Sequence, residues 1–514
     1  MTQPTRLPSA QDWTAARPVY VVWELTLACN QRCGHCGSRA GSKRSGELTL
    51  DECRDVVEQL ATLGTREITL IGGEAYLRRD WVEVVRAISE HGILATMQTG
   101  GRGLHPHLLD AAIAAGLRSV GVSIDGPDDV HDALRGVPRS AASAWRLLTL
   151  CRDRGLPTTV NTTVTPPALT RLDEMFERLI QVGVSSWQVG INVAMGRAAD
   201  DPTLLLQPYD LLELVPRLAA LARAGQPRGL VVMPGNTMGY FGPEEALLRQ
   251  GGDTLMHWTG CNAGRNGMGL ESDGTLKACP SLPREDYTAG NVRELPIEQL
   301  WQRSDGARYL RTRTVDDLWG FCRTCVYAAD CLAGCTWVSH SFLGRPGNNP
   351  YCHHRALALQ QQGFRERVQR VNAPRGEPFD IGEFSLILER EDGRGPREVQ
   401  APPPWSRPNT RDRTERPVPR RLALCPDCRR YSDPVHGQCV YCGCDLAQAN
   451  IERARHLAQA RQALAHLRKT LAESYWWPEG LADDLRERGI AAGGTTSYLS
   501  PSGQPPSRSD GSSA

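Results

Sequence analysis

Cysteine is the residue that most constrains this chain, because its 17 cysteines fall into three groups along the 514 residues. The first 18 residues lack the apolar stretch of a secretory signal, so we expect a cytoplasmic protein without structural disulfides. In that setting so many thiols indicate metal binding or redox chemistry. No apolar run approaches the ~18–20 residues that cross a bilayer, so no membrane partner is expected. A net charge of +1 gives no reason to expect nucleic acid as a partner.

Short β-branched runs alternate with helical patterns between residues 18 and 235. The predicted strands cover residues 21–25, 67–71, 94–98, 119–124, 158–164 and 187–192. Six strand–helix units in series predict an α/β fold with a parallel sheet, arranged as a partial (β/α)6 TIM-like barrel. In such a barrel the chemistry lies in the loops that follow the strands.

The first cysteine group follows the first predicted strand directly. Cys29, Cys33 and Cys36 have the spacing C-x3-C-x2-C. Three thiolates do not fill four-coordinate zinc, so a zinc knuckle would need a remote fourth ligand. The same thiolates can hold three irons of a [4Fe–4S] cluster and leave the fourth iron open to a further ligand. The strand-then-loop context favours the cluster.

This loop resembles the signature loop of radical S-adenosylmethionine (SAM) enzymes, with His35 where that family usually has an aromatic ring. The resemblance continues after the second strand in Gly72, Gly73 and Glu74, a segment that binds the amino group of SAM in the family. Ala75 stands where the family usually has proline. The resemblance implies that these residues bind a [4Fe–4S] cluster and SAM.

Polar residues at the ends of the later strands extend this candidate site. Ser123 and Asp125 resemble the family's polar pair near the SAM ribose and carboxylate, although Asp125 before Gly-Pro equally suits a turn. Further candidates for the barrel mouth are Asn161, Thr163, Gln188 and Asn192.

The second group places seven cysteines between residues 261 and 352, with little helical or strand periodicity between them. The order and spacing resemble the SPASM domain, an extension of radical SAM enzymes that houses auxiliary [4Fe–4S] clusters, and we assign it residues 257–355. The resemblance implies that one auxiliary cluster is bound by Cys261, Cys279 and Cys335. It implies that the other is bound by Cys322, Cys325, Cys331 and Cys352. Two zinc sites are the alternative.

The third group pairs two CxxC knuckles across a short loop in residues 422–446, which predicts a small zinc ribbon. Its expected Zn²⁺ ligands are Cys425, Cys428, Cys439 and Cys442, with Cys444 left over. A rubredoxin-like iron site is the alternative. Cys53 and Cys151 lie on apolar helix faces and are expected to serve packing.

The remaining segments carry no catalytic motif. We expect a helix and a strand in residues 356–400, an extended, mobile Pro/Arg-rich linker in residues 401–421, and a helical segment in residues 447–490. The composition of residues 491–514 predicts disorder.

The family resemblance implies reductive cleavage of SAM to a 5′-deoxyadenosyl radical that abstracts hydrogen from its substrate. SPASM enzymes mostly modify peptides, so the leading hypothesis is maturation of a ribosomally made peptide or protein by crosslinking, oxidation or epimerisation. A flavodoxin- or ferredoxin-type protein is the expected electron donor. The alternatives are a small-molecule or tetrapyrrole cofactor precursor as substrate, and a non-catalytic electron-transfer or zinc-binding scaffold.

Overall fold

The computed structural model describes residues 6, 8–249, 257–399, 405–419 and 421–473. The chain divides into two units, Met1–Ala449 and Asn450–Ala514. Helix α19 (Leu446–Glu473) supplies the described part of the second unit. The expected disordered tail and residues 474–490 of the expected helical segment lie outside the described residues. Among the described helices, none has both the length and the apolar character that a membrane span needs.

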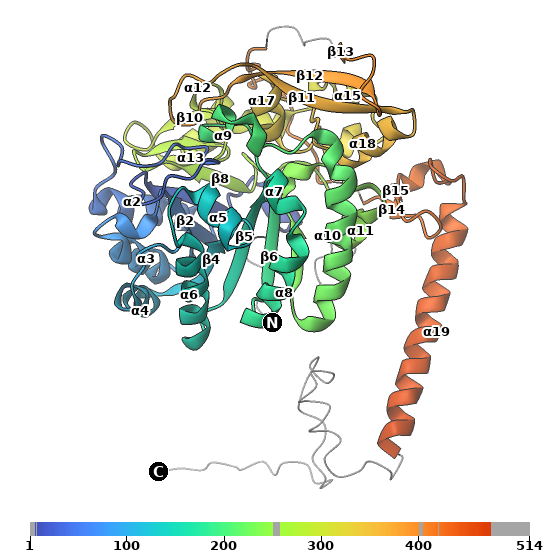
Figure 1. Ribbon diagram of the computed structural model, residues 1–514, viewed down its shortest axis with the longest axis horizontal. Coiled ribbons are helices and arrows are strands. Elements are labelled where there is room, and N and C mark those ends of the chain that lie inside the picture. Colours follow the sequence, from blue (N-terminus) through green and yellow to red (C-terminus); the bar gives the residue numbers. More distant parts are fainter. Residues whose placement is uncertain (1–5, 7, 250–256, 400–404, 420, 474–514) are drawn as a thin grey trace. The chain divides into compact units, whose positions relative to one another are not determined.

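A ten-stranded sheet forms the centre of the first unit, in the order β10-β9-β8-β1-β2-β3-β4-β5-β6-β7. Neighbouring strands from β1 to β7 pair in parallel, which confirms the predicted α/β fold with a parallel sheet (Figure 1). The strands are β1 (Tyr20–Thr26), β2 (Glu67–Gly72), β3 (Leu94–Thr99), β4 (Leu117–Ser123), β5 (Thr158–Val164), β6 (Ser186–Ile191) and β7 (Val231–Pro234). The first six match the predicted strands, and β7 was not predicted.

Helices connect these strands and cover the outer side of the sheet (Figure 1). They include α2 (Leu50–Thr62), α3 (Trp81–Glu90), α4 (Pro106–Ala115), α5 (Asp128–Arg135), α6 (Ser140–Asp153), α8 (Leu172–Val182) and α10 (Leu211–Gly225). The start of α2 shows why a helix forms there: the Thr49 hydroxyl accepts from the Glu52 N–H, and the Glu52 carboxylate accepts from the Thr49 N–H at 2.7 Å.

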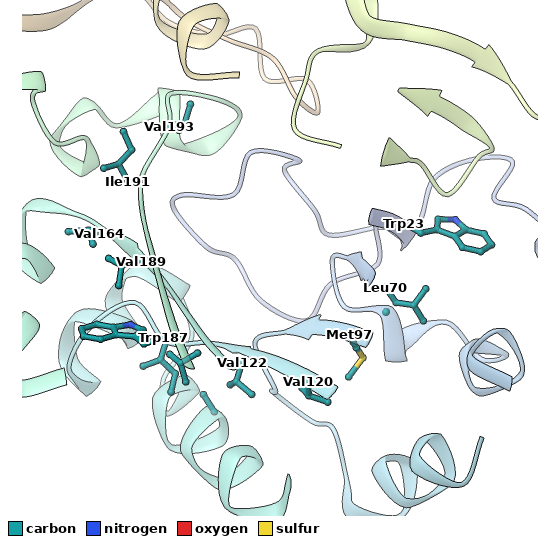
Figure 2. Close-up of a cluster of buried hydrophobic side chains, with 14 of the residues drawn as sticks. Trp23, Leu70, Met97, Val120, Val122, Val164, Trp187, Val189, Ile191 and Val193 are labelled. Atoms are coloured by element: carbon teal, nitrogen blue, oxygen red, sulfur yellow. The ribbon is translucent and has the colours of Figure 1, made fainter. Parts of the chain in front are cut away.

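The strands present an apolar face to the helices and a polar face to the barrel interior. Figure 2 shows apolar side chains from several strands in one buried cluster, among them Trp23, Met97, Val120 and Trp187. Because side chains alternate along a strand, Thr96 and Gln98 on either side of Met97 point the other way. A polar interior suits a bound polar ligand better than a packed core would.

Cys53 and Cys151 lie in the apolar cluster on the helix side of the sheet. Burial raises the pKa of each thiol to about 12, so neither thiol is reactive at neutral pH. Their expected role in packing agrees with this placement.

The region expected to consist of metal-organised loops also extends the barrel sheet. Strand β8 (Gly267–Leu270) pairs in parallel with β1, and β9 (Thr275–Lys277) and β10 (Thr288–Asn291) continue the sheet as antiparallel strands. Runs of three or four residues are too short to show a strand period in the sequence. The barrel and the cysteine-rich region therefore share one sheet.

A second, three-stranded sheet follows helix α18 (His353–Gln360). It consists of β11 (Phe364–Asn372), β12 (Glu383–Arg390) and β13 (Arg397–Glu398), and Figure 1 shows β11 and β12 near α17 (Thr336–Leu343) and α18. The segment expected to hold a helix and one strand thus contains the end of that helix and three strands.

Residues 405–419 form no helix or strand, but they do not behave as the expected mobile linker. The Arg413 guanidinium pairs with the Asp317 carboxylate at 2.9 Å, and the Thr410 N–H donates to the Asp305 carboxylate at 3.0 Å. The Pro417 carbonyl accepts from the Trp13 indole N–H at 3.0 Å. These contacts hold the segment against the cysteine-rich region and against Trp13 near the N-terminus. Sequence periodicity could not reveal them because each joins residues about a hundred or more positions apart.

Candidate functional site

The loop that carries Cys29, Cys33 and Cys36 closes on itself at the carboxyl end of β1. The Cys29 N–H donates to the Gly41 carbonyl at 2.9 Å, and the Gly41 N–H donates to the Leu27 carbonyl at 3.0 Å. From the far side of the barrel, the Arg197 guanidinium donates to the Cys33 carbonyl at 2.7 Å. The three thiols are therefore held on one short, anchored loop.

The end of β2 touches this loop so closely that only glycine fits. A Cβ at Gly73 would lie 2.3 Å from the Ala28 carbonyl oxygen and 2.6 Å from the Cys29 Cβ. Gly72 has a φ of +150°, and its Cβ would lie 2.0 Å from the Thr26 carbonyl oxygen. The two glycines let the backbone approach the cluster loop and bring Glu74 beside it.

Glu74 is buried, with 2% of its surface exposed. The Gly100 N–H donates to its carboxylate at 2.9 Å, and the Thr99 hydroxyl donates to the other oxygen. Burial raises the pKa of Glu74 to about 7, against the lowering effect of these two hydrogen bonds. A buried carboxylate with two fixed donors is suited to accept further hydrogen bonds from an amine.

Asp125 is a buried charge centre and not only a turn residue. The Arg135 guanidinium donates to its carboxylate at 2.7 Å, and the Thr163 N–H donates at 3.0 Å. His35 Nε2 lies 3.7 Å from the same carboxylate. Burial opposes ionisation of Asp125. The charge of Arg135, together with His35, His131 and the Thr163 hydrogen bond, outweighs burial and lowers the pKa of Asp125 to about 2. The carboxylate is therefore ionised at neutral pH.

Arg135 is the residue that sequence reasoning missed. Its Nη1 lies 3.7 Å from the Cys33 Sγ, so the guanidinium joins Asp125 to the cluster loop. The residue lies at the end of α5, where it follows no motif, and Cys33 is 102 positions away in the sequence. No local signal could have identified this arginine.

A row of polar side chains crosses the barrel interior next to these residues. The Gln98 amide donates to the Ser123 hydroxyl at 3.1 Å, and the Asn161 amide donates to the Gln98 side-chain carbonyl. Around this row, the buried polar atoms without a hydrogen-bond partner among the described residues include Asn30 Oδ1, Gln31 Nε2, His35 Nδ1 and Asn161 Oδ1. Such atoms indicate that the site binds a polar ligand.

These residues fit a [4Fe–4S] cluster together with SAM. Burial raises the pKa of Cys29 to about 12 and also raises that of Cys33, so a metal must displace the protons for the thiolates to form. Three thiolates on one loop leave an iron open, and the glycine-lined approach and Glu74 lie next to Cys29.

The three thiols expected to bind the first auxiliary cluster lie together. The pKa of Cys279 is raised to about 11 by burial and then by the charge of Cys261. Burial also raises the pKa of Cys335, and Cys261 and Cys279 add to the increase. Mutual repulsion of this kind requires neighbouring thiols.

The four thiols expected to bind the second auxiliary cluster line one pocket. Cys322, Cys325, Cys331 and Cys352 all face it, together with aromatic side chains that include Tyr240 and Tyr327. Burial raises the pKa of the Cys325 thiol, and the charges of Cys352 and Cys322 raise it further. A hydrogen bond from the Tyr327 N–H acts in the opposite direction. An apolar cavity lined by four thiols fits an iron–sulfur cluster.

The ribbon packs against this second set. Its hairpin consists of β14 (Ala423–Leu424) and β15 (Tyr431–Ser432), and the Tyr327 hydroxyl donates to the Tyr431 carbonyl at 2.8 Å. The Tyr327 ring stacks on Tyr240 with a centroid separation of 3.9 Å and lies near Tyr441 of the ribbon. Tyr327 therefore connects the cavity wall to the ribbon.

The ligand atoms of Cys425, Cys428, Cys439 and Cys442 lie within 4.8 Å of one another, which suits one tetrahedral metal ion. The Cys444 Sγ lies 3.2 Å from the Cys425 Sγ, so the leftover cysteine is a close neighbour of this site.

Comparison with known proteins locates two domains in the chain. The family model of the radical SAM superfamily matches residues 23–182, and that of the SPASM iron–sulfur cluster-binding domain matches residues 261–326. The matches to curated relatives span most of the length of each relative. The AdoMet-dependent heme synthase of Methanosarcina barkeri is 29% identical over 66% of this chain and 97% of that protein. The mycofactocin maturase MftC of Mycobacterium ulcerans is 28% identical over 70% of this chain and 92% of that protein. The PqqA peptide cyclase of Ruegeria pomeroyi is 27% identical over 68% of this chain and 92% of that protein.

Solved structures agree on the fold. The anSMEcpe structure with bound AdoMet and Kp18Cys peptide matches with a TM-score of 0.53 at 15% identity, covering 66% of this chain and 94% of that chain. Streptococcus suis SuiB bound to precursor peptide SuiA matches with a TM-score of 0.51 at 16% identity, covering 63% and 72%.

Proposed function

This chain is a radical SAM superfamily enzyme with a SPASM iron–sulfur domain, and from that premise we propose that it modifies a peptide or protein substrate. The proposal is supported most by the two further thiol sets. One is built from Cys261, Cys279 and Cys335, and the other from the four cysteines that line one pocket. Curated relatives of this chain include a mycofactocin maturase and a PqqA peptide cyclase. Since the chain belongs to an enzyme superfamily, a non-catalytic scaffold is not the function that we propose.

When bound, the cluster at Cys29, Cys33 and Cys36 and its SAM supply a 5′-deoxyadenosyl radical that removes hydrogen from an unactivated carbon. The residues of this chain bind and orient. Glu74 would accept from the SAM amino group, and the polar row of Gln98, Ser123 and Asn161 would hold the ribose. A flavodoxin- or ferredoxin-type donor in the cytoplasm supplies the electrons.

Arg135 has a separate task in this scheme. Its charge keeps Asp125 ionised at neutral pH, and Asp125 in turn positions His35 within the cluster loop. The cluster loop and the SAM pocket are thereby joined through one buried guanidinium.

The second candidate substrate is a tetrapyrrole. The specific observation in its favour is that the chain covers 97% of an AdoMet-dependent heme synthase. The same radical would then act on a side chain of the macrocycle, and SAM would bind to the same residues.

The deciding experiment uses the full chain, loaded anaerobically with iron and sulfide and supplied with dithionite and SAM. We expect 5′-deoxyadenosine to form, and to form faster with the correct substrate. Peptides encoded next to the gene and tetrapyrrole precursors are added in parallel. A peptide that loses two hydrogens indicates a crosslink or an oxidation, and one of unchanged mass with altered chirality indicates epimerisation. A matched control replaces Cys36 with alanine, which removes one ligand of the cluster.

Turnover only with a tetrapyrrole would replace the peptide proposal by the second candidate. A chain with all clusters loaded that forms no 5′-deoxyadenosine with any substrate would contradict both.

A further inference from the structure

The docked segment 405–419 places Arg416 between the two auxiliary thiol sets. Its backbone N–H donates to the Arg311 carbonyl at 2.9 Å, which fixes the residue in the cysteine-rich region. A Cβ built on Gly260 would lie 2.7 Å from Arg416 Nη1 and 3.5 Å from the Cys331 carbonyl oxygen. Gly260 precedes Cys261 of the first set, and Cys331 belongs to the second. The guanidinium therefore lies within a few ångströms of the chain of each set.

Two of the three nitrogens of this guanidinium have no hydrogen-bond partner in the part of the chain that the structure describes. Arg416 Nε and Nη2 are buried, and neither has a hydrogen-bond partner among the described residues. Its neighbours in the segment differ in this respect, since Arg413 pairs with Asp317 and Glu415 lies 3.5 Å from Arg265 and Arg311. Unused buried N–H groups of an arginine are costly unless a ligand accepts from them.

Arg416 also interacts electrostatically with both sets. Burial lowers its pKa to about 10, with Arg313 and Arg265 contributing, and the thiols of Cys261 and Cys331 act in the opposite direction. The side chain is charged at neutral pH. Because a thiol of each set acts on its pKa, the same cation can influence both sets.

We propose that Arg416 is a positioning residue that stabilises the reduced state of both auxiliary clusters, by its charge and by N–H donation to cluster or cysteine sulfur. The inference rests on the proposed function only in requiring that these clusters are bound. One-electron reduction adds one negative charge to a cluster, and the electron comes from the reductant supplied. A nearby cation and hydrogen bonds to sulfur favour the more negative state and raise the reduction potential.

The test is an anaerobic redox titration of the full, iron-loaded chain with dithionite, followed by electron paramagnetic resonance. In Arg416→Gln we expect the reduced-to-oxidised ratio of both auxiliary clusters to fall about tenfold at a fixed potential, a shift of about 59 mV for a one-electron couple. The SAM-site cluster, identified by the change in its signal when SAM is added, should keep its potential. Arg416→Lys retains the charge and should recover part of the shift.

Arg413→Gln is the matched control, because it removes the same charge from the same segment but from a side chain that pairs with Asp317. We expect it to leave the potentials unchanged. Unchanged auxiliary potentials in Arg416→Gln, or an equal shift in Arg413→Gln, would overturn the proposal. If Arg416→Gln loses auxiliary iron and Arg416→Lys retains it, the charge is needed and the proposal is supported. If both variants lose auxiliary iron, Arg416 has a packing role and the proposal is overturned.

No substrate enters this titration. A wild-type chain that shows the expected shift against its variants and yet modifies no peptide would therefore contradict the proposed function alone.

Discussion

Asp125 and Arg135 form a buried ion pair beside the cluster loop. In Arg135→Gln the Asp125 carboxylate would remain buried without its cation, so we expect the apo chain to lose about 3–5 kcal/mol of unfolding free energy. Urea unfolding measures this loss. Arg171→Gln is the control, because Arg171 pairs with Asp129 at the surface and its loss should not be measurable. Equal stability of the two variants would show that the buried pair is not needed.

Glu74 gives the site a dependence on pH. Its raised pKa of about 7 means that the free site binds a proton below pH 7, whereas the SAM amino group requires the carboxylate. SAM binding must then expel that proton, so affinity should fall as pH falls below 7, approaching about tenfold per pH unit. Equilibrium SAM binding to the cluster-loaded chain between pH 6 and 8 measures this. In Glu74→Gln the binding should be weaker and the slope smaller; an unchanged slope would assign the dependence to another group.

Single residues also show what the sequence can and cannot predict about the site. The cysteines and the Gly72–Glu74 segment follow strands at short, fixed spacings, and the structure places Gly73 against Cys29. Arg135, Gln98 and Arg416 carry no such spacing. Each gains its role from partners that the fold brings from 25 to more than 80 positions away.

The contact between the end of β2 and the cluster loop permits no side chain. In Gly73→Ala the new Cβ would overlap the Ala28 carbonyl and Cys29. We therefore expect the variant to lose the SAM-site cluster, which is about four iron atoms per chain, and to keep the auxiliary clusters. Iron analysis measures this. Gly41→Ala is the matched control on the same loop, because a Cβ there meets nothing within 4 Å and the iron content should stay unchanged. Retention of all iron in Gly73→Ala would show that the loop can move.

Among the elements, the six predicted barrel strands were found because each is long enough to show its own pattern. Strand β8 has four residues and β9 has three, and their pairing with the barrel depends on the edge of β1 and not on their own sequence. The prediction that the segment 405–419 is a mobile linker is wrong for a related reason. Proline and arginine are typical of exposed linkers, and here the arginines find carboxylates and carbonyls on a surface that only the fold creates.

In the first unit as a whole, the ribbon packs as a wall against the second thiol set. Cys428→Ser should remove the ribbon metal and loosen the contact between Tyr431 and Tyr327, so we expect the second auxiliary cluster to lose its absorbance faster in air. Metal analysis and bleaching kinetics measure the two effects. Cys444→Ser is the control, because it leaves the four-thiol set intact and should change neither. Equal bleaching rates in the two variants would show that the ribbon does not protect the cluster.

The hydrogen bond from Trp13 to Pro417 joins residues 404 positions apart. During synthesis the ribosome makes every candidate cluster cysteine before it makes Pro417, and the N-terminal helix α1 (Ala10–Thr14) lacks that contact until then. Bringing such distant segments together also slows folding. The nascent chain thus passes through an interval in which the cysteines of both auxiliary thiol sets have been made but the segment that carries Arg416 has not.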